Sequence, residues 1–266
     1  MKIWVNRIAI FLLSLGTILV WNLALNDQQE LIMESPFIQL ELQNEMPLLN
    51  KKDILTSIQK SQLFYSGFKR QNMNIAVVED YLSKLNEVEK AEVFYNVGET
   101  WNIHVKLKKP IARIIPDSSM SFYLDSHGQP FNLIKKYHAH IIPFTGINEF
   151  DLGNMKLNSQ GLINNDSLIT NKKLTEIYRI SNYVCNSTFY SALIVQVHFS
   201  EEEGFVLIPR VGKHKIIFGR APNEQIVAEK FEKLSIFYKE VIPYEGWEKY
   251  HTINLKFENQ IVATKK

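Results

Sequence analysis

The sequence predicts an α+β protein with a single N-terminal transmembrane helix, then a small strand-helix-helix-strand-strand unit, then a mixed β domain with flanking helices. Three observations predict this class: an apolar run near the N-terminus, strands marked by alternating apolar residues, and helices marked by apolar residues at helical spacing. The expected division is a cytoplasmic tail at 1–7, a transmembrane anchor at 8–25, a first folded unit with its juxtamembrane stretch at 26–112, and a β domain at 113–266.

The amino-acid composition excludes several classes of protein. The 266 residues include 30 Lys and Arg against 28 Asp and Glu, and this net charge of +2 does not fit a nucleic-acid-binding protein. A hydrophobic content of 45% argues against a disordered chain, and the single cysteine, Cys185, cannot form an internal disulfide. We therefore expect a globular protein without a nucleic-acid partner.

Residues 8–25 predict a membrane anchor. A helix of this length is about 27 Å long, close to the roughly 30 Å of a hydrocarbon core. Lys2 and Arg7 precede the run and only acidic charges follow it between 26 and 50, so the N-terminus is expected in the cytoplasm and the bulk of the chain outside it. A cleaved signal peptide is the alternative, but the run is longer than a usual signal-peptide core and has no small-x-small pair near Ala24.

The first folded unit is predicted to contain three strands and two helices. An alternating strand begins at Phe37, and Asn50 and Asn74 stand where helix-capping residues would begin two helices. Strands at 91–96 and 101–107 follow. This order predicts a small mixed sheet that carries both helices on one face and leaves the other face and an edge available.

The β domain begins with a stretch rich in turn-forming residues, 108–169, which holds one short strand candidate at 121–124. Helical and alternating patterns then follow one another to the end of the chain. They predict a helix at 173–185, a three-stranded meander at 192–199, 205–211 and 215–218, a helix capped by Asn223 and ended by Pro243, and a last strand at 251–263.

No residue pattern indicates an enzyme. The glycine loops of nucleotide-binding proteins, the nucleophile elbow and the HExxH zinc motif are absent from the sequence. His138 and His140 lack a nearby carboxylate, Asp125 with Gly128 fits a tight turn, and the acidic residues 201–203 fit a solvated hairpin tip. We therefore expect no catalytic residue, no metal site and no cofactor.

Several segments resemble the bacterial cell-division family FtsQ/DivIB, in the same order along nearly the whole chain. The C-terminal segment is the most specific, although Asn254, Lys256 and Phe257 stand where the family has Asp, Arg and Tyr. The matching segments are 85–93 (a helix end and strand entry), 108–113 (a transition containing Pro-x-Ala-Arg), 122–128 (Tyr-x-Leu-Asp-x-x-Gly), 143–146 (a Pro and Gly pattern) and 253–257 (Ile-Asp-Leu-Arg-Tyr).

This resemblance implies that the first unit is a POTRA domain and that the protein is a non-catalytic divisome scaffold. It also implies a single-pass inner-membrane protein at the division septum, with its bulk in the periplasm or its equivalent. The implied partners are FtsB-type and FtsL-type single-span division proteins and, through them, the septal peptidoglycan synthase pair.

The resemblance further implies that the FtsB-type partner adds a strand to the last strand of the β domain. A terminal strand has a free row of backbone N–H and C=O groups, so such pairing is physically reasonable. The alternative is that Ile261 and Val262 are ordinary core and edge residues. The implied contact residues are Phe257, Asn259, Gln260, Ile261, Val262 and Ala263.

Two other functions compete with the scaffold. A POTRA module that feeds an outer-membrane barrel needs many following strands of about 10 residues, which the β domain with its helices cannot supply. A tethered cell-envelope enzyme would need a concave site with perturbed acid and base groups. A second recruitment surface is also conceivable on the outer face of the second helix, at Glu79, Asp80 and Lys84, where simple solvation is the alternative.

Overall fold

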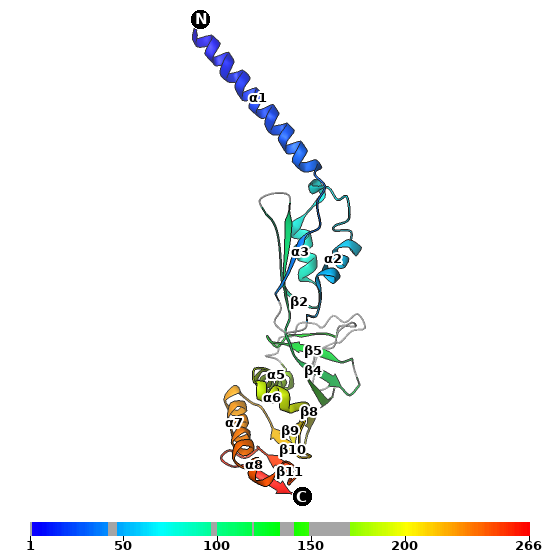
Figure 1. Ribbon diagram of the computed structural model, residues 1–266, viewed down its shortest axis with the longest axis vertical. Helices are drawn as coiled ribbons and strands as arrows, with labels where there is room; N and C mark the ends of the chain where they lie inside the picture. The colour runs from blue at the N-terminus through cyan, green and yellow to red at the C-terminus, as the bar shows by residue number, and fades with distance from the viewer. Residues whose placement is uncertain (1, 42–46, 97–99, 119, 134–140, 149–170) are drawn as a thin grey trace. The chain divides into compact units, whose positions relative to one another are not determined.

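A computed structural model describes residues 2–41, 47–96, 100–118, 120–133, 141–148 and 171–266 (Figure 1). The chain divides into two compact units, Met1–Leu107 and Lys108–Lys266. Each contains helices and a mixed sheet, which confirms the predicted α+β class.

The predicted transmembrane helix is corrected by the structure. Helix α1 runs from Lys2 to Glu30 as one element (Figure 1). Among the residues that the structure describes, however, no helix is long and apolar enough to cross a membrane, so the prediction of a span over 8–25 is wrong.

The first unit contains a three-stranded sheet in the order β1-β3-β2, with β1 parallel and β2 antiparallel to β3. The elements follow the predicted order of strand, helix, helix, strand, strand, with one short 3-10 helix inserted. They are β1 (Phe37–Glu41), α2 (Lys51–Lys60), η1 (Arg70–Asn72), α3 (Ile75–Ser83), β2 (Val88–Tyr95) and β3 (Trp101–Leu107).

Asparagine caps begin both helices of this unit, as their positions in the sequence predict. The Asn50 side chain accepts a hydrogen bond from the Asp53 backbone N–H at 2.9 Å, and the Asp53 carboxylate accepts one from the Asn50 N–H, which forms a capping box. Asn74 accepts a hydrogen bond from the Val77 N–H at 3.3 Å. Each cap contributes about 1 kcal/mol to the stability of its helix.

The core of the first unit is centred on Trp101, which is fully buried. Its ring lies 5.3 Å from that of Phe64, and its indole N–H donates to the Glu34 carbonyl at 2.8 Å. The hydrogen bond satisfies the polar end of a side chain that would otherwise be costly to bury. Ile54 and Leu82 bring the two helices onto the same cluster.

The second unit is built on a nine-stranded sheet in the order β12-β11-β10-β9-β8-β7-β4-β5-β6. Neighbours are parallel in the pairs β4–β7, β7–β8 and β10–β11, and antiparallel elsewhere. The strands are β4 (Pro110–Pro116), β5 (Phe122–Asp125), β6 (Pro130–Asn132), β7 (Ile142–Ile147), β8 (Ile194–Ser200), β9 (Gly204–Pro209), β10 (Lys215–Gly219), β11 (Tyr250–Asn254) and β12 (Val262–Lys265).

Helices of this unit gather on one side of strands β8 to β11 in Figure 1. The core between helices and sheet is rich in aromatic side chains, with Phe144, Phe205, Phe218 and Phe231 fully buried. The helices are α5 (Lys172–Cys185), α6 (Thr188–Leu193), α7 (Glu224–Glu240) and α8 (Ile242–Glu245).

Several elements of the second unit, among them β4, β7 and α6, were not predicted from the sequence. Strands β4 and β7 lie near the middle of the sheet, within the stretch expected to be rich in turns. The prolines at 110 and 116 suggest turns, but they stand at the two ends of β4, where strands tolerate proline. Helix α6, capped by the Ser187 side chain, precedes the strand that was expected to begin at 192.

A buried lysine joins helix α7 to the end of strand β10. Lys230 is only 8% exposed, and its ammonium donates to the carbonyls of Phe218 at 2.8 Å and Arg220 at 2.7 Å. Burial, with a smaller contribution from nearby Lys233, lowers the pKa of Lys230 to about 8. The two hydrogen bonds compensate part of the cost of burying this group.

We expect Lys230 to make the second unit more stable as the pH rises from about 8 to 10.5. In this window the folded chain releases the lysine proton while the unfolded chain, with its ordinary pKa, keeps it, so a higher pH favours folding. The gain is at most roughly 3 kcal/mol. Urea unfolding of wild type and Lys230→Met at both pH limits measures it. The variant should lack this increment, and an equal pH dependence in the two proteins would contradict the prediction.

Candidate partner-binding edge

Strand β12 lies at one edge of the nine-stranded sheet and pairs antiparallel with β11. Ala263 faces Ile253 in the ladder and packs against the core, whereas Val262 is 42% exposed. Within the described part of the chain, the backbone of Val262–Lys265 forms hydrogen bonds with β11 and with no other segment. The outer side of β12 is therefore an open row of backbone donors and acceptors.

The structure places the six predicted contact residues in two different settings. Val262 and Ala263 belong to β12, and Ile261 immediately before it packs partly buried against the core. Phe257, Asn259 and Gln260 are exposed in the connection between β11 and β12. Sequence reasoning missed Thr264 and Lys265, which complete the strand, because the apolar alternation ends at Ala263.

The predicted continuous strand over 251–263 is wrong, because the chain turns between β11 and β12. The Asn254 side chain accepts a hydrogen bond from the Lys256 N–H at 3.0 Å and begins the turn. Lys233 of α7 then donates to the carbonyls of Phe257 and Glu258, both at 2.7 Å. These carbonyls have left the ladder and bind the ammonium instead.

The C-terminal end of β12 contacts the segment after α8. Glu245 forms an ion pair with Lys249 and lies 3.9 Å from the Lys265 ammonium. Lys266 pairs with Glu248 at 3.2 Å, and its N–H donates to the Lys249 carbonyl at 3.0 Å. The hydrogen bond from Lys249 lowers the pKa of Glu245, so this carboxylate stays charged at neutral pH. Exposed pairs of this kind contribute little stability, but they favour one position of the strand end.

Two of the other three sheet edges, β6 and β2, offer less to an added strand, whereas β1 pairs only with β3 within the described part of the chain. Strand β6 has three residues and begins with Pro130, which lacks a backbone donor. At the β2 edge of the three-stranded sheet, the Glu79 carboxylate accepts the Val93 N–H at 2.9 Å. Glu79, a candidate for a second recruitment surface, therefore occupies one donor of that edge, while the other two candidates, Asp80 and Lys84, pair with each other on the surface.

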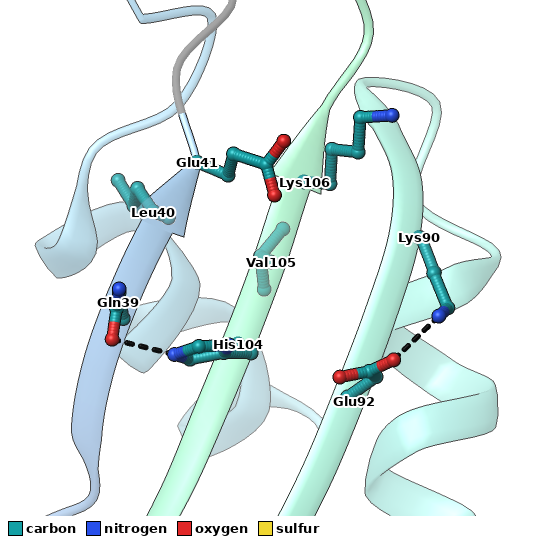
Figure 2. Close-up of a pocket in the computed structure, with 8 residues that line it drawn as sticks. All are labelled: Gln39, Leu40, Glu41, Lys90, Glu92, His104, Val105 and Lys106. Atoms are coloured by element: carbon teal, nitrogen blue, oxygen red, sulfur yellow. Dashed lines mark hydrogen bonds and ion pairs between the residues drawn. The ribbon is translucent and has the colours of Figure 1, made fainter.

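The open face of the three-stranded sheet carries a polar cavity of about 570 Å³ (Figure 2). Gln39 and His104 share a hydrogen bond there, and Figure 2 shows both on the face opposite the helices. The charged residues of this face are paired across strands or along them: Lys90 with Glu92 at 2.5 Å and Lys106 with Glu89 at 2.7 Å. Of the charged residues that line the cavity, Lys90 and Lys106 stand against Glu41 and Glu92, so the described lining has no net charge that would favour a ligand of one sign.

Groups that could have supplied catalysis serve structural roles instead. Asp125 accepts the N–H groups of His127 and Gln129 at 2.9 and 2.8 Å, and burial raises its pKa. At the tip between β8 and β9, Glu203 pairs with Lys215 at 2.7 Å. Over the described residues, no group of three or more His, Cys, Asp and Glu could hold a metal ion. The pair of histidines at 138 and 140 lies outside the described residues.

The chain matches the model of a known protein family. The family model described as FtsQ/DivIB, C-terminal related, matches residues 109–264. The match covers more than half of the chain and includes the sheet from β4 to all but the last residue of β12. No curated protein matches the chain.

We expect Lys233→Met to loosen the connection before β12 without disturbing the core. The methionine keeps the apolar stem of the side chain but removes the ammonium that binds two carbonyls, at a cost of about 1–2 kcal/mol. Amide hydrogen exchange should become faster at 257–265 and stay unchanged in β8 and β9. Lys239→Met, at an exposed position of the same helix, is the control. Unchanged exchange at 257–265 would show that Lys233 does not hold the connection.

Proposed function

Because the chain belongs to the FtsQ/DivIB C-terminal-related family, it is a cell-division protein, and we propose that it is a scaffold whose strand β12 accepts a strand from an FtsB-type partner. The observation that carries this proposal is the open outer side of β12. The family is generally non-catalytic, which agrees with a role in recruitment. Membership in it also supports an association with the division septum.

Strand addition suits the chemistry of this edge. An incoming strand would satisfy the open N–H and C=O groups of β12, and main-chain pairing of this kind gives affinity that does not depend on sequence. Selection would come from the side chains beside it. Val262 and Thr264 are exposed and are available to a partner, whereas Ile261 and Ala263 pack inward.

The connection before β12 supplies further exposed groups. Phe257 is 43% exposed, although its carbonyl is bound by Lys233. A large aromatic side chain held on a fixed backbone loses little entropy when a partner covers it. Phe257, Asn259 and Gln260 thus extend the proposed contact beyond the strand itself.

We propose that other division proteins join through the first partner. An FtsL-type protein and the septal peptidoglycan synthase pair would be bound indirectly, by way of the FtsB-type protein. The scaffold itself would then act by holding partners together rather than by chemistry.

We expect Val262→Glu to weaken capture of the FtsB-type protein by about tenfold or more, because the new carboxylate would lie unpaired beside the added strand. The wild-type side chain is largely exposed, so the variant should fold normally by circular dichroism. The measurement is titration of the full chain with the purified FtsB-type protein of the same cell.

Val195→Glu is the matched control. Val195 is 37% exposed on β8, which pairs on both sides with β7 and β9 and cannot accept a further strand. The Val195→Glu variant should bind the partner as the wild type does. If Val262→Glu binds normally, or if both variants lose binding equally, β12 is not the contact.

In cells, depletion of a division scaffold should give undivided filaments, and normal division would reject the scaffold role.

A further inference from the structure

A second cavity, of about 530 Å³, lies between the start of α5 and the turn that follows β10. Three cationic side chains line it, from two segments that are more than 40 residues apart in the sequence. The lining residues are Lys172, Thr175, Glu176, Arg179, Arg220 and Pro222. The cavity includes no residue of β11, of β12 or of their connection, so it is separate from the edge described above.

Glu176, the one carboxylate among the described residues that line the cavity, is already neutralised. Glu176 is 5% exposed, and its two oxygens receive the Arg220 guanidinium at 3.1 and 2.9 Å. One of these oxygens also accepts the Ala221 N–H at 2.9 Å. This pair fixes the turn after β10 to α5 and leaves no negative charge in the cavity to repel an anion.

The two remaining cations give the cavity an excess positive charge. Arg179 uses one guanidinium nitrogen to donate to the Ala221 carbonyl at 3.0 Å, which fixes the group while its other donors remain. Lys172 lines the cavity and is exposed, and its ammonium forms no ion pair or hydrogen bond with another residue that the structure describes. The first turn of α5 adds partial positive charge of the same sign.

A second lysine, Lys173, follows Lys172 in α5 and is buried. Lys173 is 7% exposed, its ammonium lies 3.0 Å from the centre of the Phe199 ring, and the Arg220 guanidinium lies 5.7 Å from the same ring. The Phe199 ring thus forms cation–π contacts with one cation from α5 and one from the turn after β10. Lys173 also faces the exposed Glu201 carboxylate at 3.9 Å, so the excess positive charge of the cavity comes from Lys172 and Arg179.

We infer that this cavity binds an acidic peptide segment of a protein partner, whose carboxylates pair with Lys172 and Arg179. The planar guanidinium of a fixed arginine matches a carboxylate with two parallel hydrogen bonds, and two neighbouring carboxylates would neutralise the two uncompensated cations. The inference does not depend on strand addition at β12.

The test is an NMR titration of the ¹⁵N-labelled full chain with hexaglutamate, hexaglutamine and inorganic phosphate in parallel. We expect hexaglutamate to shift the amides of Lys172, Thr175 and Ala221 most strongly, and hexaglutamine to leave them in place. Raising the salt concentration should weaken the binding, because the contact is electrostatic. Shifts spread over the whole surface, or equal shifts with hexaglutamine, would overturn the inference, and binding of phosphate alone would overturn the peptide as the occupant.

Lys172→Glu is the decisive variant, because its side chain is exposed and a glutamate in the first turn of a helix is well tolerated. We expect it to weaken hexaglutamate binding by about tenfold, since an attractive charge becomes a repulsive one. Lys239→Glu makes the same charge change at an exposed position of α7 outside the cavity and should alter binding by less than about twofold. Equal effects of the two variants would show that only net charge matters.

Discussion

Helix α7 fixes the C-terminal part of the large sheet, because two of its lysines bind backbone carbonyls of neighbouring segments. Lys230 holds the end of β10 and the turn after it, and Lys233 holds the connection between β11 and β12. The apolar side of the same helix, with Phe231 and Leu234, is buried in the core. One packed helix therefore positions both the cationic cavity beside Arg220 and the open edge strand, although the two surfaces share no residue.

The edge strands of the two sheets differ in how well they are protected from pairing with another strand. A proline and a short length blunt β6, and a carboxylate from Glu79 occupies a donor of β2. Strand β12 has neither protection, and its antiparallel neighbour β11 is fixed in the sheet by hydrogen bonds to β10 that continue through the Leu255 N–H to the Ile217 carbonyl. An unprotected edge is a hazard for aggregation unless a partner covers it, so the contrast with β6 and β2 favours a binding role for β12.

Local signals in the sequence were sufficient for the elements that depend on local interactions. Asn50 and Asn74 mark helix starts because a capping side chain bonds to its own helix. The break after β11 was missed because apolar alternation continues through Phe257, while the lysine that binds the turn lies 24 residues earlier. The strands β4 and β7 were missed because their prolines suggest turns, and only the full sheet shows them paired on both sides. The cavity could not be predicted either, since Glu176 and Arg220 meet only in the folded chain.

The length of β12 limits what its edge can do alone. Four residues present only about four backbone groups along one side, and short strands pair weakly in water. A chain that docks there needs a second point of attachment, or must already be confined nearby, so that its local concentration reaches the millimolar range. Binding at this edge would then depend steeply on the local concentration of the partners, and a complex formed from dilute components would dissociate readily.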